Sequence, residues 1–186
     1  MSLRGLVLAG GRSRRFGRDK AMARYDGMSF LDRAVGLLKS LDLKPVVVTR
    51  RDADYAETGC PVIYDKLPEK GPLGGLYTAL TVFNESSFLV LTCDMPQVTL
   101  SSLDDLLDMR QNGVQVTVYR LGEALQPFPG IYEASVLPLV REQLKQDNLS
   151  MKNLLQKAVK RTLEPRGGPD LFDNINYIED LSRIEN

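Results

Sequence analysis

The hydrophobic pattern of this chain alternates short apolar runs with longer segments of helical periodicity. The short runs cover residues 6–8, 45–49, 61–64 and 88–92. Runs of this length are too short for buried helices and suit strands that are buried on both faces. Between the first two runs, Phe30, Ala34 and Leu38 recur at helical spacing behind Ser29, a typical N-cap residue. Strands separated by helices predict βαβ units and an α/β protein with a mostly parallel sheet.

The second half of the chain is expected to complete this sheet. Residues 114–119 alternate polar and apolar side chains, as a half-buried strand does. Residues 124–132 are rich in proline and are expected to form an edge strand, because proline cannot donate to a β-ladder. The remaining expected elements are helices at 135–146 and behind Ser150, a short strand at 161–164, and a terminal helix from about Tyr177.

Composition narrows the classes of function. A chain of 186 residues without a linker is expected to be one domain, residues 1–186. Lys plus Arg equals Asp plus Glu, at 24 each, which argues against nucleic acids and membrane surfaces as partners. The absence of histidine excludes histidine-based acid–base catalysis and imidazole metal sites. Two cysteines form no disulfide framework, and without a signal peptide or membrane-length apolar run a cytoplasmic location is expected.

Candidate chemistry begins directly after the first strand. Gly10 and Gly11 are expected to let the chain turn sharply and point backbone N–H groups at an anion. Five cations follow within nine residues, which suits a triphosphate; they are Arg12, Arg14, Arg15, Arg18 and Lys20. The alternative is a solvent-exposed basic loop. In either case the positive charge is local, because the whole chain is neutral.

Polar side chains in two later segments extend the candidate site. Asp94 follows the apolar run 88–92, at the edge of the sheet where α/β proteins bind ligands. The alternative role for Asp94 is to cap the following turn or helix. Asp19 is expected either to orient a neighbouring cation or to contact the ligand. Asn174 and Asn176 share one side of an extended segment, and a helix-entry cap is their alternative role.

Residues 8–20, with the pattern L-A-G-G-x-S-x-R-F-G-x-D-K, resemble the signature of the MobA-type molybdenum cofactor guanylyltransferases, within the nucleotide-diphospho-sugar-transferase-like class. Further matches follow in the family's order: Gly71–Gly75, Cys93–Pro96, Gln126-Pro127 with Gly130 and Tyr132, and Asn174–Asn176 before Glu179-Asp180-Leu181. The chain departs from the family's usual residues at Phe16, Thr49, Phe128 and Tyr177. None of these departures removes a charged group.

The resemblance implies a Rossmann-like three-layer sandwich that transfers GMP from GTP to the terminal phosphate of molybdenum-molybdopterin, releasing pyrophosphate. It implies Mg²⁺ as the cofactor, held by Asp94, with Arg15, Lys20 and Asp94 as the catalytic residues. The implied nucleotide contacts are Leu8, Ala9, Gly10, Gly11, Lys20, Thr49, Asp65, Gly74 and Asp94, and the implied acceptor contacts are Asn174 and Asn176. Proteins that insert or hand over the molybdenum cofactor are the expected protein partners.

This chemistry needs no protein base, because the attacking phosphate oxygen is already anionic at neutral pH. The protein must align two phosphates and neutralise charge on the leaving group, which a chain without histidine can do. Two alternatives stay open at this point. One is a cytidylyltransferase or sugar-1-phosphate nucleotidyltransferase of the same fold, and the other is a nucleotide-binding handover protein without turnover.

Overall fold

A seven-stranded sheet forms the centre of the molecule, with strand order β5-β4-β1-β6-β8-β7-β9. The structure is a computed structural model and describes residues 2–11, 16, 19–51, 53, 55–175 and 177–180. The strands of the sheet are β1 (Leu3–Leu8), β4 (Val46–Thr49), β5 (Val62–Tyr64), β6 (Ser87–Thr92), β7 (Val116–Leu121), β8 (Ala124–Glu133) and β9 (Lys160–Leu163). All neighbouring pairs are parallel except the two that involve β8. The expected mostly parallel α/β sheet is confirmed.

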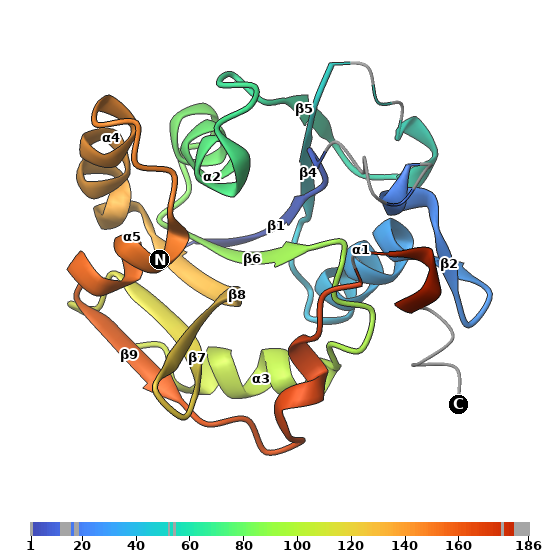
Figure 1. The fold of residues 1–186 in the computed structure, drawn as a ribbon. Coiled ribbons are helices and arrows are strands. Elements are labelled where there is room, and N and C mark those ends of the chain that lie inside the picture. The colour runs from blue at the N-terminus through green and yellow to red at the C-terminus, as the bar shows by residue number, and fades with distance from the viewer. Residues whose placement is uncertain are drawn as a thin grey trace.

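Helices cover both faces of this sheet, and Figure 1 shows the three layers. Helices α2, α4 and α5 lie on one face, and α1 and α3 lie on the other. Their bounds are α1 (Phe30–Ser40), α2 (Gly71–Val82), α3 (Leu100–Asp108), α4 (Leu137–Lys145) and α5 (Met151–Lys157). Ser29 caps α1 by accepting a hydrogen bond from the Asp32 N–H, and Ser150 caps α5 in the same way through the Asn153 N–H. The expected helix starts are therefore confirmed by their cap geometry.

Short elements connect the main ones. The hairpin of β2 (Arg24–Tyr25) and β3 (Met28–Ser29) precedes α1, and the sequence pattern did not predict it. The described residues also contain the short 3₁₀ helices η1 (Lys20–Met22), η2 (Ala56–Thr58), η3 (Ala134–Val136), η4 (Pro169–Phe172) and η5 (Ile178–Asp180). The described part of the expected terminal helix is the single turn η5, and residues 181–186 lie outside the described residues.

The position of β8 corrects one expectation. We expected the proline-rich residues 124–132 to form an edge strand, yet β8 lies between β6 and β7. Strand β6 pairs with Gly130 to Glu133 only, and the register with β7 shifts at Val118/Tyr119, so that Gln126 and Gly130 pair but residues 127–129 do not. Pro127 and Pro129 therefore lie in the irregular part of the strand, where their missing N–H groups interrupt no hydrogen bonds between strands. An interior strand tolerates proline for this reason.

Close packing of α2 requires a glycine. A Cβ on Gly74 would lie 2.8 Å from the carbonyl oxygen of Leu67, a backbone atom that cannot move away as a side chain can. Gly36, in the interior of α1, has no atom within 4 Å of the corresponding position. A methyl group on Gly74 would therefore clash with the backbone, whereas a methyl group on Gly36 would not.

We expect Gly74→Ala to lower the free energy of unfolding by about 1–3 kcal/mol through overpacking. Gly36→Ala is the matched control and is expected to raise that free energy by about 0.5–1 kcal/mol, because alanine is the better helix former. Urea denaturation of both variants measures the two changes. Equal effects of the two substitutions would show that the contact with Leu67 is unimportant.

The described residues contain no helix long and apolar enough to cross a membrane.

Candidate active site

The carboxyl ends of β1 and β6 form the centre of the candidate site. The two strands are parallel neighbours, and their register pairs Leu8 with Thr92, the last residue of each strand. The segments that follow, Ala9 to Gly11 and Cys93 to Pro96, therefore leave the sheet side by side. The expectation that Asp94 lies at the ligand-binding edge of the sheet agrees with this register.

Lys20 and Asp94 meet at this edge although 74 residues separate them in the sequence. Lys20 Nζ donates to Asp94 Oδ2 at 3.2 Å, and the two side chains are only 12% and 27% exposed. The other carboxylate oxygen, Asp94 Oδ1, is buried and has no hydrogen-bond partner among the described residues. Thr92 Oγ1, two residues earlier, is in the same condition. A buried polar oxygen without a hydrogen bond costs free energy unless a ligand supplies the bond. These two oxygens therefore indicate a ligand-binding site.

The position of Lys20 depends on Asp19 and on a distant tyrosine. Asp19 is the N-cap of η1, and its Oδ1 accepts from the Ala21 N–H at 3.1 Å. Its Oδ2 accepts from the Tyr55 hydroxyl at 2.8 Å. Burial and the neighbouring Asp19 raise the pKa of the Tyr55 hydroxyl, so it keeps its proton and donates throughout the neutral range. Asp19 therefore orients the turn that carries Lys20, which was one of its two expected roles.

Sequence reasoning missed Tyr55, since nothing marks it within the polar residues 50–57. We expect Tyr55→Phe to lower the catalytic rate about tenfold while changing the melting temperature little, because the ring stays buried and only the hydroxyl, with its hydrogen bonds to Asp19 and Thr49, is lost. Steady-state kinetics and thermal unfolding measure the two effects. Tyr64→Phe, at an exposed position in β5, is the control. An unchanged rate would mean that the Tyr55–Asp19 bond does not position Lys20.

Gly10 and Gly11 serve the site differently from what was expected. Neither has a positive φ, so neither uses a backbone conformation reserved for glycine. Gly10 has its nearest neighbours at 3.9 Å from a Cβ position, and Gly11 has none within 4 Å. Both are exposed. Their contribution is the open space beside the backbone, which lets a ligand approach the main chain closely.

Two further nucleotide candidates lie at the carboxyl ends of β4 and β5. Thr49 is fully buried, and its hydroxyl donates to the Ala9 carbonyl at 3.4 Å. Asp65 uses Oδ1 to accept from the Leu67 N–H and from the Thr78 hydroxyl, at 2.9 and 2.8 Å. Its Oδ2 lies 3.2 Å from where a Cβ on Gly74 would be. Thr49 and Asp65 thus lie beside the site, between β4, β5 and the start of α2. Their contact with a nucleotide stays a prediction.

The remaining candidates lie on two segments. Arg15 and Asn176, like Arg12, Arg14 and Arg18, are outside the described residues. Asn174 is exposed, and the next residue, Ile175, donates its N–H to the Asp94 carbonyl at 2.9 Å. The segment with Asn174 thus adjoins Asp94 through the backbone, across 80 residues of sequence. Leu8 and Ala9 are buried at the end of β1, so any nucleotide contact they make would be through the main chain.

Cys93 is a packing residue beside this site. It lies against the main apolar core and against a small cluster formed by Phe16, Ala23, Phe30 and Ile175. Burial, together with the charge of Asp94, raises the pKa of its thiol to about 12. At pH 8 the thiol is therefore protonated and a poor nucleophile.

We expect iodoacetamide to leave Cys93 unmodified at pH 8 in the folded protein and to alkylate it after denaturation. Peptide mass spectrometry reads each cysteine separately, and Cys60 serves as the internal comparison. Rapid alkylation of Cys93 in the folded state would contradict the assigned role.

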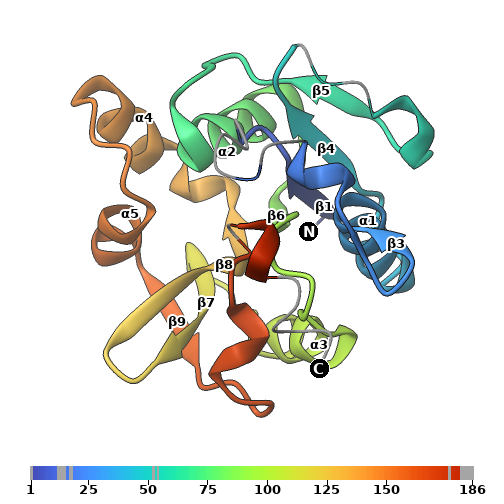
Figure 2. The same ribbon diagram turned by 45° about the vertical axis from the view of Figure 1, so that its right-hand side comes forward.

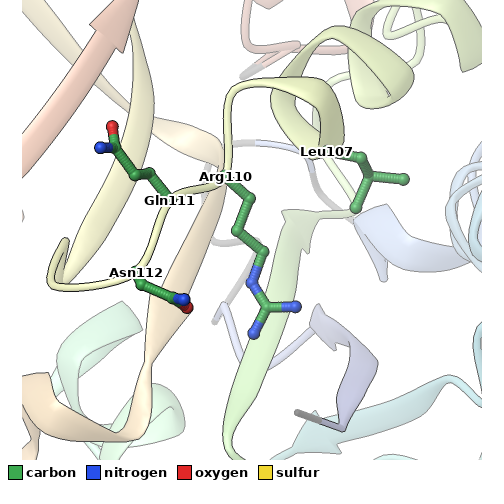
Figure 3. Close-up of a pocket in the computed structure, with 4 residues that line it drawn as sticks. All are labelled: Leu107, Arg110, Gln111 and Asn112. Carbon is green, nitrogen blue, oxygen red and sulfur yellow. The ribbon is translucent and has the colours of Figure 1, made fainter.

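Two cavities lie away from the Lys20–Asp94 pair. One, of about 470 Å³, is lined by Leu107, Arg110, Gln111 and Asn112 (Figure 3). Arg110 is bound there to Glu133 and to Ser87, the first residue of β6, so this cavity lies at the edge of the sheet opposite to Asp94. A second cavity, of about 340 Å³, lies between Arg33 of α1, Gln97 and the η4 region. Arg33 Nε donates there to the Pro96 carbonyl and thus supports the turn that carries Asp94.

Comparison with known proteins identifies the family of this chain. A family model described as "MobA-like NTP transferase domain" matches residues 5–162. A protein from Desulfosudis oleivorans named "Molybdenum cofactor guanylyltransferase" is 28% identical over 97% of this chain and 93% of its own length. A protein of the same name from Syntrophotalea carbinolica is 29% identical over 96% and 88%. The crystal structure of "Molybdopterin-guanine dinucleotide biosynthesis protein A" from Archaeoglobus fulgidus superposes with a TM-score of 0.80, at 24% identity over 98% of this chain and 96% of that one, which supports the fold.

Proposed function

Because the chain belongs to the MobA-like NTP transferase family, we propose that it transfers GMP from GTP to the terminal phosphate of molybdenum-molybdopterin. The products are the molybdopterin guanine dinucleotide cofactor and pyrophosphate. The observation that carries the proposal is the Lys20–Asp94 pair at the carboxyl ends of β1 and β6, with Asp94 Oδ1 buried and unpartnered among the described residues. The names of relatives that cover nearly the whole chain supply the substrates.

The reaction forms one P–O bond and breaks another. An anionic oxygen of the acceptor phosphate attacks the α-phosphorus of GTP, and the bond to the α–β bridging oxygen breaks to release pyrophosphate. Lys20 offers a point charge to the leaving phosphates, and Gly10 and Gly11 leave the main-chain N–H groups accessible. Arg15 is proposed to hold non-bridging oxygens through its planar guanidinium. The protein's contribution is alignment and charge neutralisation, and no proton transfer is required.

Asp94 suits Mg²⁺ as the proposed cofactor. Its carboxylate supplies the oxygen donor that Mg²⁺ prefers, and Oδ1 lacks a partner among the described residues. No group of three acidic or cysteine side chains gathers among these residues, which is compatible with an ion that takes phosphate oxygens and waters for its other positions. When bound, the ion would withdraw electron density from the reacting phosphates. An ion held by Asp94 would compete with Lys20 for the carboxylate and would leave the Lys20 ammonium to the nucleotide.

Asn174 and Asn176 are proposed to contact the acceptor. Asn174 is exposed and adjoins the Asp94 turn through Ile175, whereas Thr49 and Asp65 lie at the carboxyl ends of β4 and β5. A cytoplasmic location and proteins that hand over the molybdenum cofactor remain expectations from the sequence.

Two measurements test the function. Thermal unfolding with Mg²⁺ and each of the four nucleoside triphosphates is expected to show selective stabilisation by GTP. Pyrophosphate release from GTP is expected only when molybdenum-molybdopterin is present. Release with CTP but not GTP would indicate a cytidylyltransferase, sugar 1-phosphates as acceptors would indicate a sugar nucleotidyltransferase, and selective binding without release would indicate a handover protein. Any of these three results overturns the proposal.

A further inference from the structure

Helix α1 adjoins both segments that carry the ion pair of the candidate site. The hairpin of β2 and β3 follows the turn of Lys20 along the chain and leads directly into α1. Figures 1 and 2 show this hairpin beside the helix. On the other side, the Arg33 side chain of α1 reaches the segment that follows Asp94. One rigid element therefore has contacts toward both members of the pair.

Backbone hydrogen bonds connect the start of α1 to the turn of Lys20. The Ala23 N–H donates to the Lys20 carbonyl at 3.0 Å, and the Ala23 carbonyl accepts from the Phe30 N–H at 2.8 Å. Phe30 is the first residue of α1 and is only 1% exposed. The turn that carries Lys20 is thus fixed relative to the first turn of the helix.

The Arg33 guanidinium connects the same part of the helix to the turn of Asp94. Arg33 Nε donates to the carbonyl of the buried Pro96 at 2.5 Å, across 63 residues of sequence. A charged donor makes this bond stronger than one between two neutral groups. Arg33 Cζ also lies 5.3 Å from the centre of the Tyr25 ring in β2, which favours one position of the guanidinium. Arg33 thus holds a backbone atom two residues after Asp94.

We propose that Arg33 is a positioning residue that sets where the Asp94 carboxylate lies relative to Lys20. It acts through the Pro96 carbonyl, and the buried start of α1 provides the fixed support. Because the helix holds both turns, the carboxylate and the ammonium are already placed when the substrates bind. The inference rests on the proposed function, in which Asp94 holds Mg²⁺ and Lys20 faces the leaving phosphates.

Arg33→Met tests this role, because methionine removes the donor and keeps an apolar stem. We expect the Mg²⁺ concentration for half-maximal pyrophosphate release to rise about tenfold and kcat to fall about tenfold. Calorimetric titration gives a readout without turnover. Its probe is Mg²⁺ with a GTP analogue that has a methylene group between the α- and β-phosphorus, and the dissociation constant is expected to rise about tenfold. Arg33→Lys keeps a cationic donor and is expected to bring all three values to within about threefold of the unaltered protein.

Arg4→Met is the matched control for loss of stability. Arg4, near the start of β1, is a partly buried arginine that bonds to Glu85 at 3.1 Å, and its Cζ lies 4.7 Å from the centre of the Phe83 ring. This variant is expected to lower the melting temperature at least as much as Arg33→Met, yet to leave the Mg²⁺ dependence and the dissociation constant unchanged.

Two results would overturn the positioning role while leaving the proposed function intact. One is an Arg33→Met protein in which only the melting temperature changes, as in Arg4→Met. The other is an Arg33→Lys protein as impaired as Arg33→Met. If the unaltered protein does not bind the GTP analogue selectively, the proposed function itself fails, and the role of Arg33 fails with it.

Discussion

Asp94→Asn is expected to lower the rate of pyrophosphate release at least about a hundredfold, the largest effect of any single substitution proposed for this chain. Asparagine keeps the size of the side chain but removes the negative charge and one carboxylate oxygen. It would therefore lose both the proposed Mg²⁺ and the ion pair with Lys20. Rates measured across a range of Mg²⁺ concentrations check the result, and excess Mg²⁺ is expected to restore only a small part of the loss.

Stability distinguishes this explanation from misfolding. Asp94 Oδ1 is buried without a partner among the described residues, so the carboxylate contributes less to folding than a fully bonded one would. The melting temperature of Asp94→Asn is therefore expected to change by only a few degrees. Asp147→Asn is the matched control, because Asp147 forms an exposed ion pair with Lys70 at 2.6 Å. If Asp94→Asn retained full activity, the metal assignment would be wrong.

Lys20→Met is expected to have the second largest effect, a loss of about a hundredfold in kcat/KM for GTP. Methionine keeps much of the apolar stem and removes the charge that the leaving phosphates need. The substitution also leaves the partly buried Asp94 without its cation, so the melting temperature is expected to fall as well. Initial rates at varied GTP concentration separate the effect on KM from the effect on kcat.

A control lysine completes this experiment. Lys157 pairs with Glu142 at 3.5 Å, with both side chains about half exposed, so Lys157→Met removes a surface ion pair of little expected consequence. Lys20→Arg is a useful second variant, since arginine keeps the charge but has a broader head group. The leaving-group role would be refuted by a Lys20→Met enzyme with unchanged kcat/KM, whatever its stability.

Local sequence was sufficient where the structure depends on local rules. The apolar run that precedes Asp94 had to become a strand buried on both faces, and Ser29 and Ser150 had to cap helices, because these outcomes need only neighbouring residues. The same reasoning failed for β8. Its prolines favour an edge by themselves, and only the irregular pairing opposite Val118 and Tyr119 makes an interior position possible.

The candidate site divides in the same way. Residue types and their order along the chain indicated a phosphate-binding loop with Lys20 and a carboxylate at Asp94. Glycines, clustered cations and an acidic residue after a strand can be recognised by residue type alone. Tyr55 and Arg33 cannot be recognised in this way. One is a phenol in a polar stretch and the other a single cation within a helical segment, so their roles follow only from what they contact.

By itself, then, the sequence determined the α/β class, the alternation of strands and helices along the first half of the chain, and the chemical character of the loop after β1. Only the tertiary structure decided that Lys20 meets Asp94 across 74 residues, that Asp94 keeps one oxygen unpartnered among the described residues, and that Arg33 of α1 donates to the turn of Asp94. The physical reason is that periodicity and capping act over a few residues, whereas the register of parallel strands and the packing of separate segments bring distant residues into contact.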